Sequence, residues 1–199
     1  MPRVSETERQ EWDRRYTVGE YRPRTWASPF LEQWIDHFPR GRALDLACGA
    51  GRNALRLAEA GHQVDALDIS RAAITMARTE SEHRGLEVAW QVADLDDAEL
   101  QTDAYDVITV IRYVNRNLWP RLISALTQNG WLLIEHHLQT TADVDGPGSP
   151  DFRLQPQELL ESFRTLRIVS YEEVLETSER ERTTYALARL VACKGDPGW

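Results

Sequence analysis

Short apolar runs alternate with helix-like stretches along most of the chain. Residues 43–47, 63–67 and 87–93 have the length and composition of strands. Residues 105–111 form a nearly continuous apolar run, as expected of a strand buried on both faces of a parallel sheet. Strands that alternate with helical segments predict an α/β fold, with a mostly parallel sheet and helices on both faces.

Helices are predicted where apolar residues recur every three or four positions. The clearest case covers residues 29–38, where Phe30, Leu31 and Trp34 share one face. Gly61 ends a second helix near Ala60, because glycine readily adopts the backbone conformation that terminates helices. Further helices are expected over residues 5–15, 70–83 and 120–128, with Ser70 as the N-cap of the second of these.

The last third of the chain has a different pattern. Residues 131–135 form a fifth strand, and residues 166–177 and 183–193 are β-like runs around the polar turn 178–181. These runs predict an antiparallel hairpin. The expected sheet therefore has seven strands, mostly parallel, with an antiparallel C-terminal hairpin strand over the terminal region 166–193.

Composition limits the classes of function. The 199 residues, 42% of them hydrophobic, fit a single domain over residues 1–199 with one core. We find no apolar run long enough for a membrane span, no signal segment, and only two cysteines. The net charge of −9 disfavours nucleic acid. We therefore expect a cytoplasmic protein, a monomer or homodimer, with a small-molecule substrate and no nucleic-acid or membrane partner.

A glycine-rich turn follows the first strand. The letters GAGRNA at residues 49–54 fit the pattern G-x-G-x-x-G/A. Glycine tolerates positive φ and lets a ligand approach the backbone closely. A plain strand-to-helix connection is the alternative, but the strand before the turn and the helix after it favour a nucleotide-type cofactor site.

Three carboxylates at strand ends discriminate between cofactors. Asp45 would repel a pyrophosphate but would pair with an ammonium group, unless it only caps loop amides. Asp68 can accept hydrogen bonds from ribose hydroxyls, although it can also cap the next helix. Asp94 can bind an adenine amino group, whereas Asp96 and Asp97 belong to a solvated acidic turn. The set favours S-adenosylmethionine (SAM) over a nicotinamide dinucleotide.

The run LDLACGAG at residues 44–51, then Asp68 and the letters VAD at residues 92–94, resembles the class I SAM-dependent methyltransferases. The letters DFRL at residues 151–154 and ALAR at residues 186–189 are similar to the branch containing tellurite-resistance and thiopurine methyltransferases. The resemblance implies a Rossmann-like fold with a cofactor-binding core over residues 42–138. It implies SAM as cofactor and S-adenosylhomocysteine as product, with contacts from Ala47, Gly49, Gly51, Asn53, Ile69, Leu95 and Ile111 in addition to the three acids.

The N-terminal segment 1–38 is rich in aromatic residues and arginines. In related small-molecule methyltransferases a similar segment covers the cofactor as a helical lid or cap, and the resemblance makes Trp12 and Tyr16 candidate contacts. An aromatic face beside a sulfonium is favourable through cation–π attraction. The alternative is an amphipathic helix that packs on the core.

The acceptor side is predicted from residues after the fourth and fifth strands. Arg112 can pair with an anionic substrate group, and Tyr113 can line the methyl pocket. His136 and His137 are adjacent and point to opposite faces of a strand, so they cannot readily share a metal; we predict no metal site. One of them, with His136 as the candidate, can act as a base or a hydrogen-bond donor. Alternatively, Arg112 forms a salt bridge within the protein, Tyr113 only packs in the core, and the histidine is structural.

The loop at residues 139–156 is expected either to form a wall on the substrate side or to be a surface insertion. The tip of the fourth strand lacks the Asn/Asp-Pro-Pro-aromatic motif of DNA and amine methyltransferases. The expected function is therefore in-line methyl transfer to a small molecule with a soft sulfur, selenium or tellurium nucleophile or an anionic one, by proximity and desolvation. A non-catalytic SAM-binding sensor or subunit is the first alternative. A nicotinamide-dependent oxidoreductase is the second.

Overall fold

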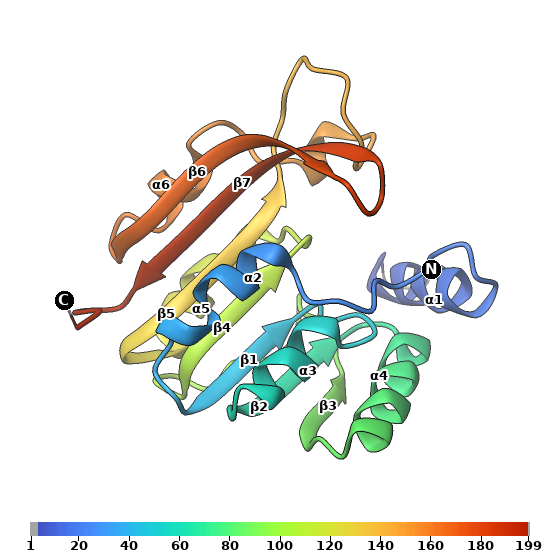
Figure 1. Ribbon diagram of the computed structural model, residues 1–199, viewed down its shortest axis with the longest axis horizontal. Coiled ribbons are helices and arrows are strands. Elements are labelled where there is room, and N and C mark those ends of the chain that lie inside the picture. Colours follow the sequence, from blue (N-terminus) through green and yellow to red (C-terminus); the bar gives the residue numbers. More distant parts are fainter. Residues whose placement is uncertain (1–3, 199) are drawn as a thin grey trace.

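The computed structural model describes residues 4–198; residues 1–3 of the predicted N-terminal cap, and residue 199, lie outside them. Its strands form one seven-stranded sheet in the order β3-β2-β1-β4-β5-β7-β6 (Figure 1). The first five run parallel, β7 is antiparallel to β5, and β6 is antiparallel to β7. The strands are β1 (Arg42–Leu46), β2 (Gln63–Asp68), β3 (Val88–Val92), β4 (Tyr105–Ile111), β5 (Leu126–His137), β6 (Arg167–Ser178) and β7 (Thr183–Cys193).

Helices cover both faces of this sheet, as predicted (Figure 1). On one face α2, α3 and α4 share an apolar cluster that includes Phe30, Leu55 and Ile74. On the other face α5 and α6 contribute Leu122 and Leu159 to a second cluster. The helices are α1 (Val4–Thr17), α2 (Pro29–Trp34), α3 (Arg52–Glu59), α4 (Arg71–Arg84), α5 (Trp119–Ala125) and α6 (Glu158–Ser162), with short 3-10 turns η1 (Ile35–His37), η2 (Arg116–Leu118) and η3 (Pro150–Phe152).

The boundary between α5 and β5 differs from the prediction. The helix expected over residues 120–128 ends at Ala125, and the strand begins at Leu126 instead of residue 131. Leu126 is fully buried and pairs with Tyr105 across the sheet, so tertiary packing extends the strand backward. The short helix α6 was not predicted, because five residues are too few to show helical periodicity.

The alternation of side chains along β5 places polar groups on defined faces. Leu132 and Ile134 belong to the cluster under α5 and α6, whereas Trp131 and Leu133 face α2 and α3. By the two-residue period of a strand, Glu135 continues the second set. The carboxylate of Glu135 therefore lies between the sheet and helices α2 and α3, near the carboxyl end of β5.

Helix α1 lies beyond the carboxyl ends of the parallel strands, close to the start of α4 (Figure 1). Asp13 of α1 accepts hydrogen bonds from the Ala72 amide at 2.9 Å and the Ser70 hydroxyl at 2.8 Å. Ser70 in turn caps α4, as predicted, by accepting from the Ala73 amide. The N-terminal segment is thus attached to the edge of the sheet where the glycine turn lies.

Candidate functional site

The glycine-rich turn after β1 has the conformation that its sequence requires. Ala47, Gly49 and Gly51 all have positive φ, at 52°, 55° and 86°. A Cβ at Gly51 would come within 2.4 Å of the Trp90 ring, so no larger residue fits without rearrangement. A Cβ at Gly49 would lie 2.7 Å from the hydroxyl of Tyr16, which places α1 directly over the turn.

Asp45 is buried beneath this turn, with 1% of its surface exposed. Its Oδ1 accepts a hydrogen bond from the Thr109 hydroxyl at 2.7 Å, but its Oδ2 has no hydrogen-bond partner among the described residues. Burial raises the pKa of Asp45 from 3.8 to about 7, and the Thr109 bond and the charge of Arg52 offset part of this effect. An unpaired buried carboxylate oxygen fits a cationic ligand, because a ligand ammonium would compensate it directly or through water.

Asp68 ends β2 and holds the glycine turn in place. Its carboxylate accepts from the Gly49 amide and from the Ser70 amide, both at 2.8 Å. Burial raises the pKa of Asp68, while these two bonds act in the opposite direction. Each carboxylate oxygen has two lone pairs, so both oxygens can still accept a hydrogen bond from a ribose hydroxyl.

Asp94 lies at the tip of β3, and its Oδ1 accepts from the Asp96 amide at 3.0 Å. It lines a small hollow under α1 together with Ile69 and Val92, at the place expected for an adenine ring. Leu95 and Ile111 are buried in the apolar clusters on the two faces of the sheet. The three acids predicted to bind the cofactor therefore lie at or near the carboxyl ends of three neighbouring strands, Asp45 within β1, Asp68 at the end of β2 and Asp94 after β3.

The aromatic side chains of the N-terminal segment form one group over this edge. The ring centroids of Trp12, Tyr16 and Tyr21 lie between 5.1 and 6.3 Å apart. Burial raises the pKa of the Tyr16 hydroxyl. Helix α1 occupies the position of a cap over the cofactor turn; that it opens and closes as a lid stays a prediction.

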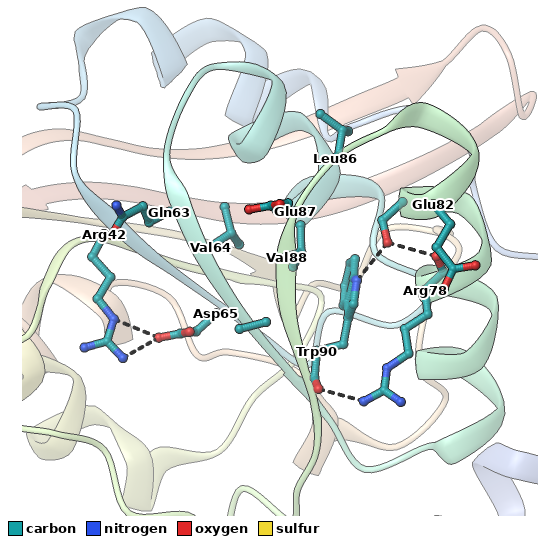
Figure 2. Close-up of a pocket in the computed structure, with 12 residues that line it drawn as sticks. Arg42, Gln63, Val64, Asp65, Arg78, Glu82, Leu86, Glu87, Val88 and Trp90 are labelled. Carbon is teal, nitrogen blue, oxygen red and sulfur yellow. Dashed lines mark hydrogen bonds and ion pairs between the residues drawn. The ribbon is translucent and has the colours of Figure 1, made fainter.

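A second, larger hollow lies at the amino ends of β1, β2 and β3 (Figure 2). None of the predicted site residues lines it. Its polar side chains satisfy one another: Arg42 pairs with Asp65 at 2.7 Å, and the Trp90 ring nitrogen donates to the Ser81 hydroxyl. We assign it no function.

Arg112 follows β4, as the sequence indicates, and its backbone is in the left-handed region with φ of 64°. Its Nε lies 3.3 Å from Oε1 of Glu135, without the geometry of a hydrogen bond. Its Nη1 lies 3.2 and 3.3 Å from the two ring nitrogens of His137, and its Cζ lies 4.8 Å from the Tyr185 ring centre. The guanidinium is therefore held between aromatic faces, and burial lowers its pKa.

The rings of the two histidines lie side by side at the end of β5, with centroids 5.5 Å apart and nearly perpendicular planes, instead of pointing to opposite faces of the strand as predicted. His136, the candidate from the sequence, bonds through Nε2 to the Phe152 carbonyl at 2.9 Å. His137 is the one that lies beside Arg112. Burial lowers the pKa of His136 to about 4; burial and the charge of Arg112 lower that of His137 to about 2. Both rings are therefore neutral at pH 7.

Tyr113 and the loop at residues 139–156 complete this side. The Tyr113 hydroxyl accepts from Asn115 at 3.3 Å, and burial raises its pKa to about 12. The loop folds over His137, because a Cβ at Gly146 would lie 2.5 Å from the ring Nδ1. The Asp145 amide also donates to the Thr184 carbonyl of β7 at 2.8 Å. The loop thus lies beside His137; that it forms a wall on the substrate side stays a prediction.

Several polar residues of the site were not found from the sequence. Glu135, 2% exposed, bridges Arg112 to Arg189 of β7, which it contacts at 2.6 Å. Arg189 is 4% exposed and also pairs with Glu172 and Glu176 of β6. An acid within the apolar strand and an arginine within the apolar run of β7 were the available signals.

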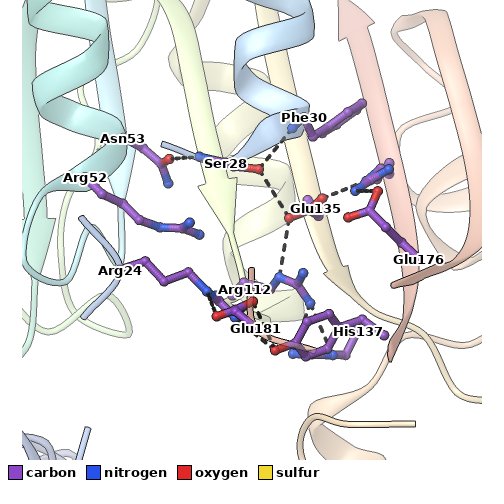
Figure 3. Close-up of polar contacts among 12 residues, drawn as sticks. Arg24, Ser28, Phe30, Arg52, Asn53, Arg112, Glu135, His137, Glu176 and Glu181 are labelled. Carbon is purple, nitrogen blue, oxygen red and sulfur yellow. Dashed lines mark hydrogen bonds and ion pairs between the residues drawn. The ribbon is translucent and has the colours of Figure 1, made fainter. Parts of the chain in front are cut away.

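Arginines from the N-terminal half also reach this region (Figure 3). Arg24 pairs with Glu181 of the hairpin turn and donates to the Tyr185 hydroxyl at 3.1 Å. Asn53, a predicted cofactor contact, is buried and accepts from the Ser28 amide at 2.9 Å, so it ties the preceding segment to α3. Its neighbour Arg52 extends toward Arg24.

The described residues offer neither a metal-binding cluster nor a membrane-spanning helix. No group of three or more His, Cys, Asp or Glu side chains within residues 4–198 is arranged to hold a metal ion. No helix in the same part of the chain is both long enough and apolar enough to cross a membrane.

Comparison with known proteins relates the chain to methyltransferases. Residues 43–129 match the family described as a methyltransferase domain. The protein named probable S-adenosyl-L-methionine-dependent methyltransferase TehB, from Haemophilus influenzae, is 29% identical over 66% of this chain and 48% of its own length. A ubiquinone biosynthesis O-methyltransferase from Burkholderia vietnamiensis is 31% identical over 55% of this chain and 47% of its own length. The chain thus spans about half the length of these curated relatives.

Solved structures show the same fold. The crystal structure of TehB from Haemophilus influenzae has a TM-score of 0.73 at 23% identity, over 90% of this chain and 66% of that chain. The cyclase SpnF has a TM-score of 0.73 at 18% identity, over 96% of both chains. These matches confirm the predicted Rossmann-like class I fold and the resemblance to class I SAM-dependent methyltransferases, in particular to TehB.

Proposed function

Because the chain is related to the class I SAM-dependent methyltransferases and carries their fold, we propose that it transfers a methyl group from SAM to a small anionic or soft-nucleophile molecule. One observation carries the proposal above the others. Asp45 is buried under the glycine turn with an unpaired oxygen and a raised pKa, and a cationic ligand would compensate its charge and favour the ionised form. The amino-acid end of SAM carries an ammonium group, whereas a dinucleotide presents a pyrophosphate there.

The other acids match the rest of this cofactor. Asp68 would accept from the ribose hydroxyls, and Asp94 would accept from the adenine amino group in the hollow beneath α1. Gly49 and Gly51 allow the backbone to pass close to the methionine part, with Tyr16 of α1 as the cover. Tyr16 and Trp12 would exclude water from the reacting groups, which strengthens the electrostatic interactions inside the site.

The methyl donor would lie between the glycine turn and Arg112. SAM, when bound, supplies an electrophilic methyl group on a sulfonium that leaves as the thioether of S-adenosylhomocysteine. Arg112 orients the acceptor through its fixed fork of donors, and Glu135 and His137 hold Arg112 in place. Tyr113 and the loop at residues 139–156 would enclose the acceptor. Holding donor and acceptor in line is the main contribution that such a site makes to the rate.

Turnover with an acceptor panel is the first test. We expect the protein to bind SAM and to convert it to S-adenosylhomocysteine with at least one of a set of thiols, selenite and tellurite. Tight SAM binding without turnover across a broad panel would favour a non-catalytic sensor instead. Such a test is needed because a cyclase shares the fold, so the fold alone does not determine the reaction.

Removal of Asp68 tests the cofactor assignment. We expect Asp68→Ala to weaken SAM binding by at least about tenfold, because it removes a charge-assisted acceptor for the ribose and loosens the glycine turn. Asp65→Ala is the matched control, since Asp65 lies on the same strand but pairs with Arg42 and Tyr105 at the amino end. Equal SAM affinity for both variants, measured by titration calorimetry, would refute the role of Asp68. Protection from thermal unfolding by NAD but not by SAM would favour an oxidoreductase.

A further inference from the structure

We propose that Arg24, Arg52 and Arg112 form one anion-binding site that holds the negatively charged group of the methyl acceptor, a compact oxyanion or carboxylate. This inference rests on the proposed function. The three side chains come from three parts of the chain: the segment before α2, the first residue of α3, and the residue after β4. Figure 3 shows Arg52 and Arg24 reaching from the same side toward Arg112.

Arg52 has unused hydrogen-bonding capacity. It forms no ion pair with the other residues that the structure describes, and its one hydrogen bond there runs from Nη1 to the Trp26 carbonyl at the long distance of 3.4 Å. A guanidinium carries five N–H donors, so most of them remain available. Its electrostatic neighbours include Arg24 and Arg112, which repel it.

Arg112 uses only part of its guanidinium: Nη1 contacts the ring nitrogens of His137, but Nε has no hydrogen-bond acceptor among the described residues. Its contact with Glu135 lacks hydrogen-bond geometry. Glu135 directs its other oxygen to Arg189 at 2.6 Å, so this carboxylate is shared between two cations. The left-handed backbone of Arg112 is a strained conformation of the kind that clusters at functional sites.

The charges around the three arginines do not balance. Glu181 pairs with Arg24, and half of the Glu135 carboxylate faces Arg112, while Arg52 forms no ion pair within residues 4–198 and feels Glu135 only at a distance. Burial and mutual repulsion lower the pKa of Arg52 and Arg112. Partly buried cations without counter-ions are costly, and an anion bound between them would remove that cost.

Glu181 acts in this arrangement as a built-in counter-ion. It reaches back from the turn between β6 and β7 to Arg24, and it accepts from the Tyr185 hydroxyl at 3.3 Å. A carboxylate of the chain thus occupies a guanidinium that an incoming anion would otherwise use. Glu181 therefore weakens anion binding, and its removal is expected to strengthen it.

The nearby titratable groups favour an acceptor that is already ionised. His137 is the histidine beside Arg112, and its ring is too weak a base to remove a proton near pH 7. His136 bonds to the Phe152 carbonyl, and its pKa of about 4 makes it a weak base as well. The hydroxyl of Tyr185 is taken up by Arg24 and Glu181. An oxyanion or carboxylate acceptor needs no general base, because it carries no proton that must be removed before its lone pair can attack the methyl group.

Anion titration of the full chain loaded with S-adenosylhomocysteine tests the inference. The probes are sodium selenite, sodium sulfate and sodium acetate, each followed by calorimetry in a buffer of low ionic strength. We expect at least one to bind, and Arg52→Gln to weaken it by about tenfold or more. Arg56→Gln is the matched control, because Arg56 lies one turn further along α3 and pairs with Glu32; it should change affinity less than twofold.

Glu181→Gln supplies a test in the opposite direction. We expect it to tighten binding of the same probe several-fold, because Arg24 loses its internal competitor. A purely structural role of the hairpin turn would weaken binding or leave it unchanged. Failure of all three anions to bind the wild-type protein would overturn the inference. So would equal effects of Arg52→Gln and Arg56→Gln.

The carboxylate of the cofactor is the other anion that Arg52 could hold, and the same titrations separate the two sources. If Arg52→Gln weakens S-adenosylhomocysteine tenfold and leaves the probe anion unchanged, the anion of this site is the cofactor's and the inference is wrong. If the wild-type protein does not bind S-adenosylhomocysteine at all, the proposed function is contradicted instead. The anion site can then still be tested by titrating the same anions into the protein without cofactor.

Discussion

The two sides of the candidate site are built in different ways. The proposed cofactor side has a glycine turn and three carboxylates near the ends of consecutive strands, all within residues 45–94. The acceptor side gathers Arg24, Arg52 and Arg112 with Glu135 and Glu181 from five separate segments. One side has carboxylates for a cationic ligand and the other has guanidinium groups for an anionic one. Local sequence thus encodes the first, and only the tertiary fold assembles the second.

The largest effect is expected on the cofactor side, from Gly51→Ala. The substitution forces alanine to φ of 86° and brings its Cβ within 2.4 Å of the Trp90 ring. Strain and overpacking together should lower the free energy of unfolding by about 3 to 5 kcal/mol, as measured by urea denaturation. Gly85→Ala is the control, since Gly85 also has positive φ but no atom within 4 Å of the added Cβ. It should lose only about 1 kcal/mol.

On the acceptor side we expect a smaller but clear loss from Glu135→Gln. The variant leaves Arg112 and Arg189 without their shared negative charge inside the sheet layer. Because Arg189 keeps Glu172 and Glu176, the loss should be about 2 to 3 kcal/mol, below the usual range for a broken buried pair. SAM affinity of the folded variant should stay within about threefold. A tenfold fall in SAM affinity would show that the two sides are not separate.

The ionisation of Asp45 should make SAM binding depend on pH. Without ligand, the pKa of Asp45 is raised to about 7, and the carboxyl must lose its proton to pair with the ligand ammonium. SAM affinity should therefore rise with pH. Between pH 6 and pH 7.5 we expect a gain of about five- to tenfold by calorimetry. Asp45→Asn should abolish this dependence. Thr109, Arg52, the Ala54 backbone amide and Asp68 are the other groups that act on this carboxyl, and they are unchanged in the variant.

The raised pKa of Asp45 also makes the stability of the folded protein depend on pH. The folded protein without ligand binds more protons than the unfolded chain between about pH 4 and pH 7, so the contribution of Asp45 to stability falls as pH rises through that window. Asp45→Asn should remove this part of the pH dependence. An identical pH dependence of unfolding in wild type and variant would contradict the burial argument.

The smallest effect is expected far from both sides. Arg84 at the end of α4 pairs with Glu80 and Glu59 on the surface. Arg84→Gln should change the free energy of unfolding by less than about 1 kcal/mol and should leave SAM and anion binding unchanged. It gives the baseline against which the other variants are compared, in the same denaturation and titration experiments.

Features that depend on local sequence were predicted correctly, whereas features that depend on tertiary contacts were not. The strands and the N-cap Ser70 were readable because alternation and capping are local properties. The turn at Gly49 and Gly51 was readable for the same reason. The start of β5 at Leu126 was not, because its pairing with Tyr105 decides it.

The acceptor side could be predicted only in part. Arg112 was found because it directly follows an apolar strand. The choice between His136 and His137 depended on which of the two rings contacts Arg112, which a single sequence does not show. Arg24 and Glu181 are far apart in the chain and meet only when the hairpin folds back.

A crystal structure of the protein with S-adenosylhomocysteine and selenite tests the central claim most directly. The account predicts the amino-acid end of the ligand near Asp45, its ribose on Asp68, and the anion within hydrogen-bond distance of Arg52 and Arg112. An anion on the carboxylate side, or a cofactor among the arginines, would contradict it.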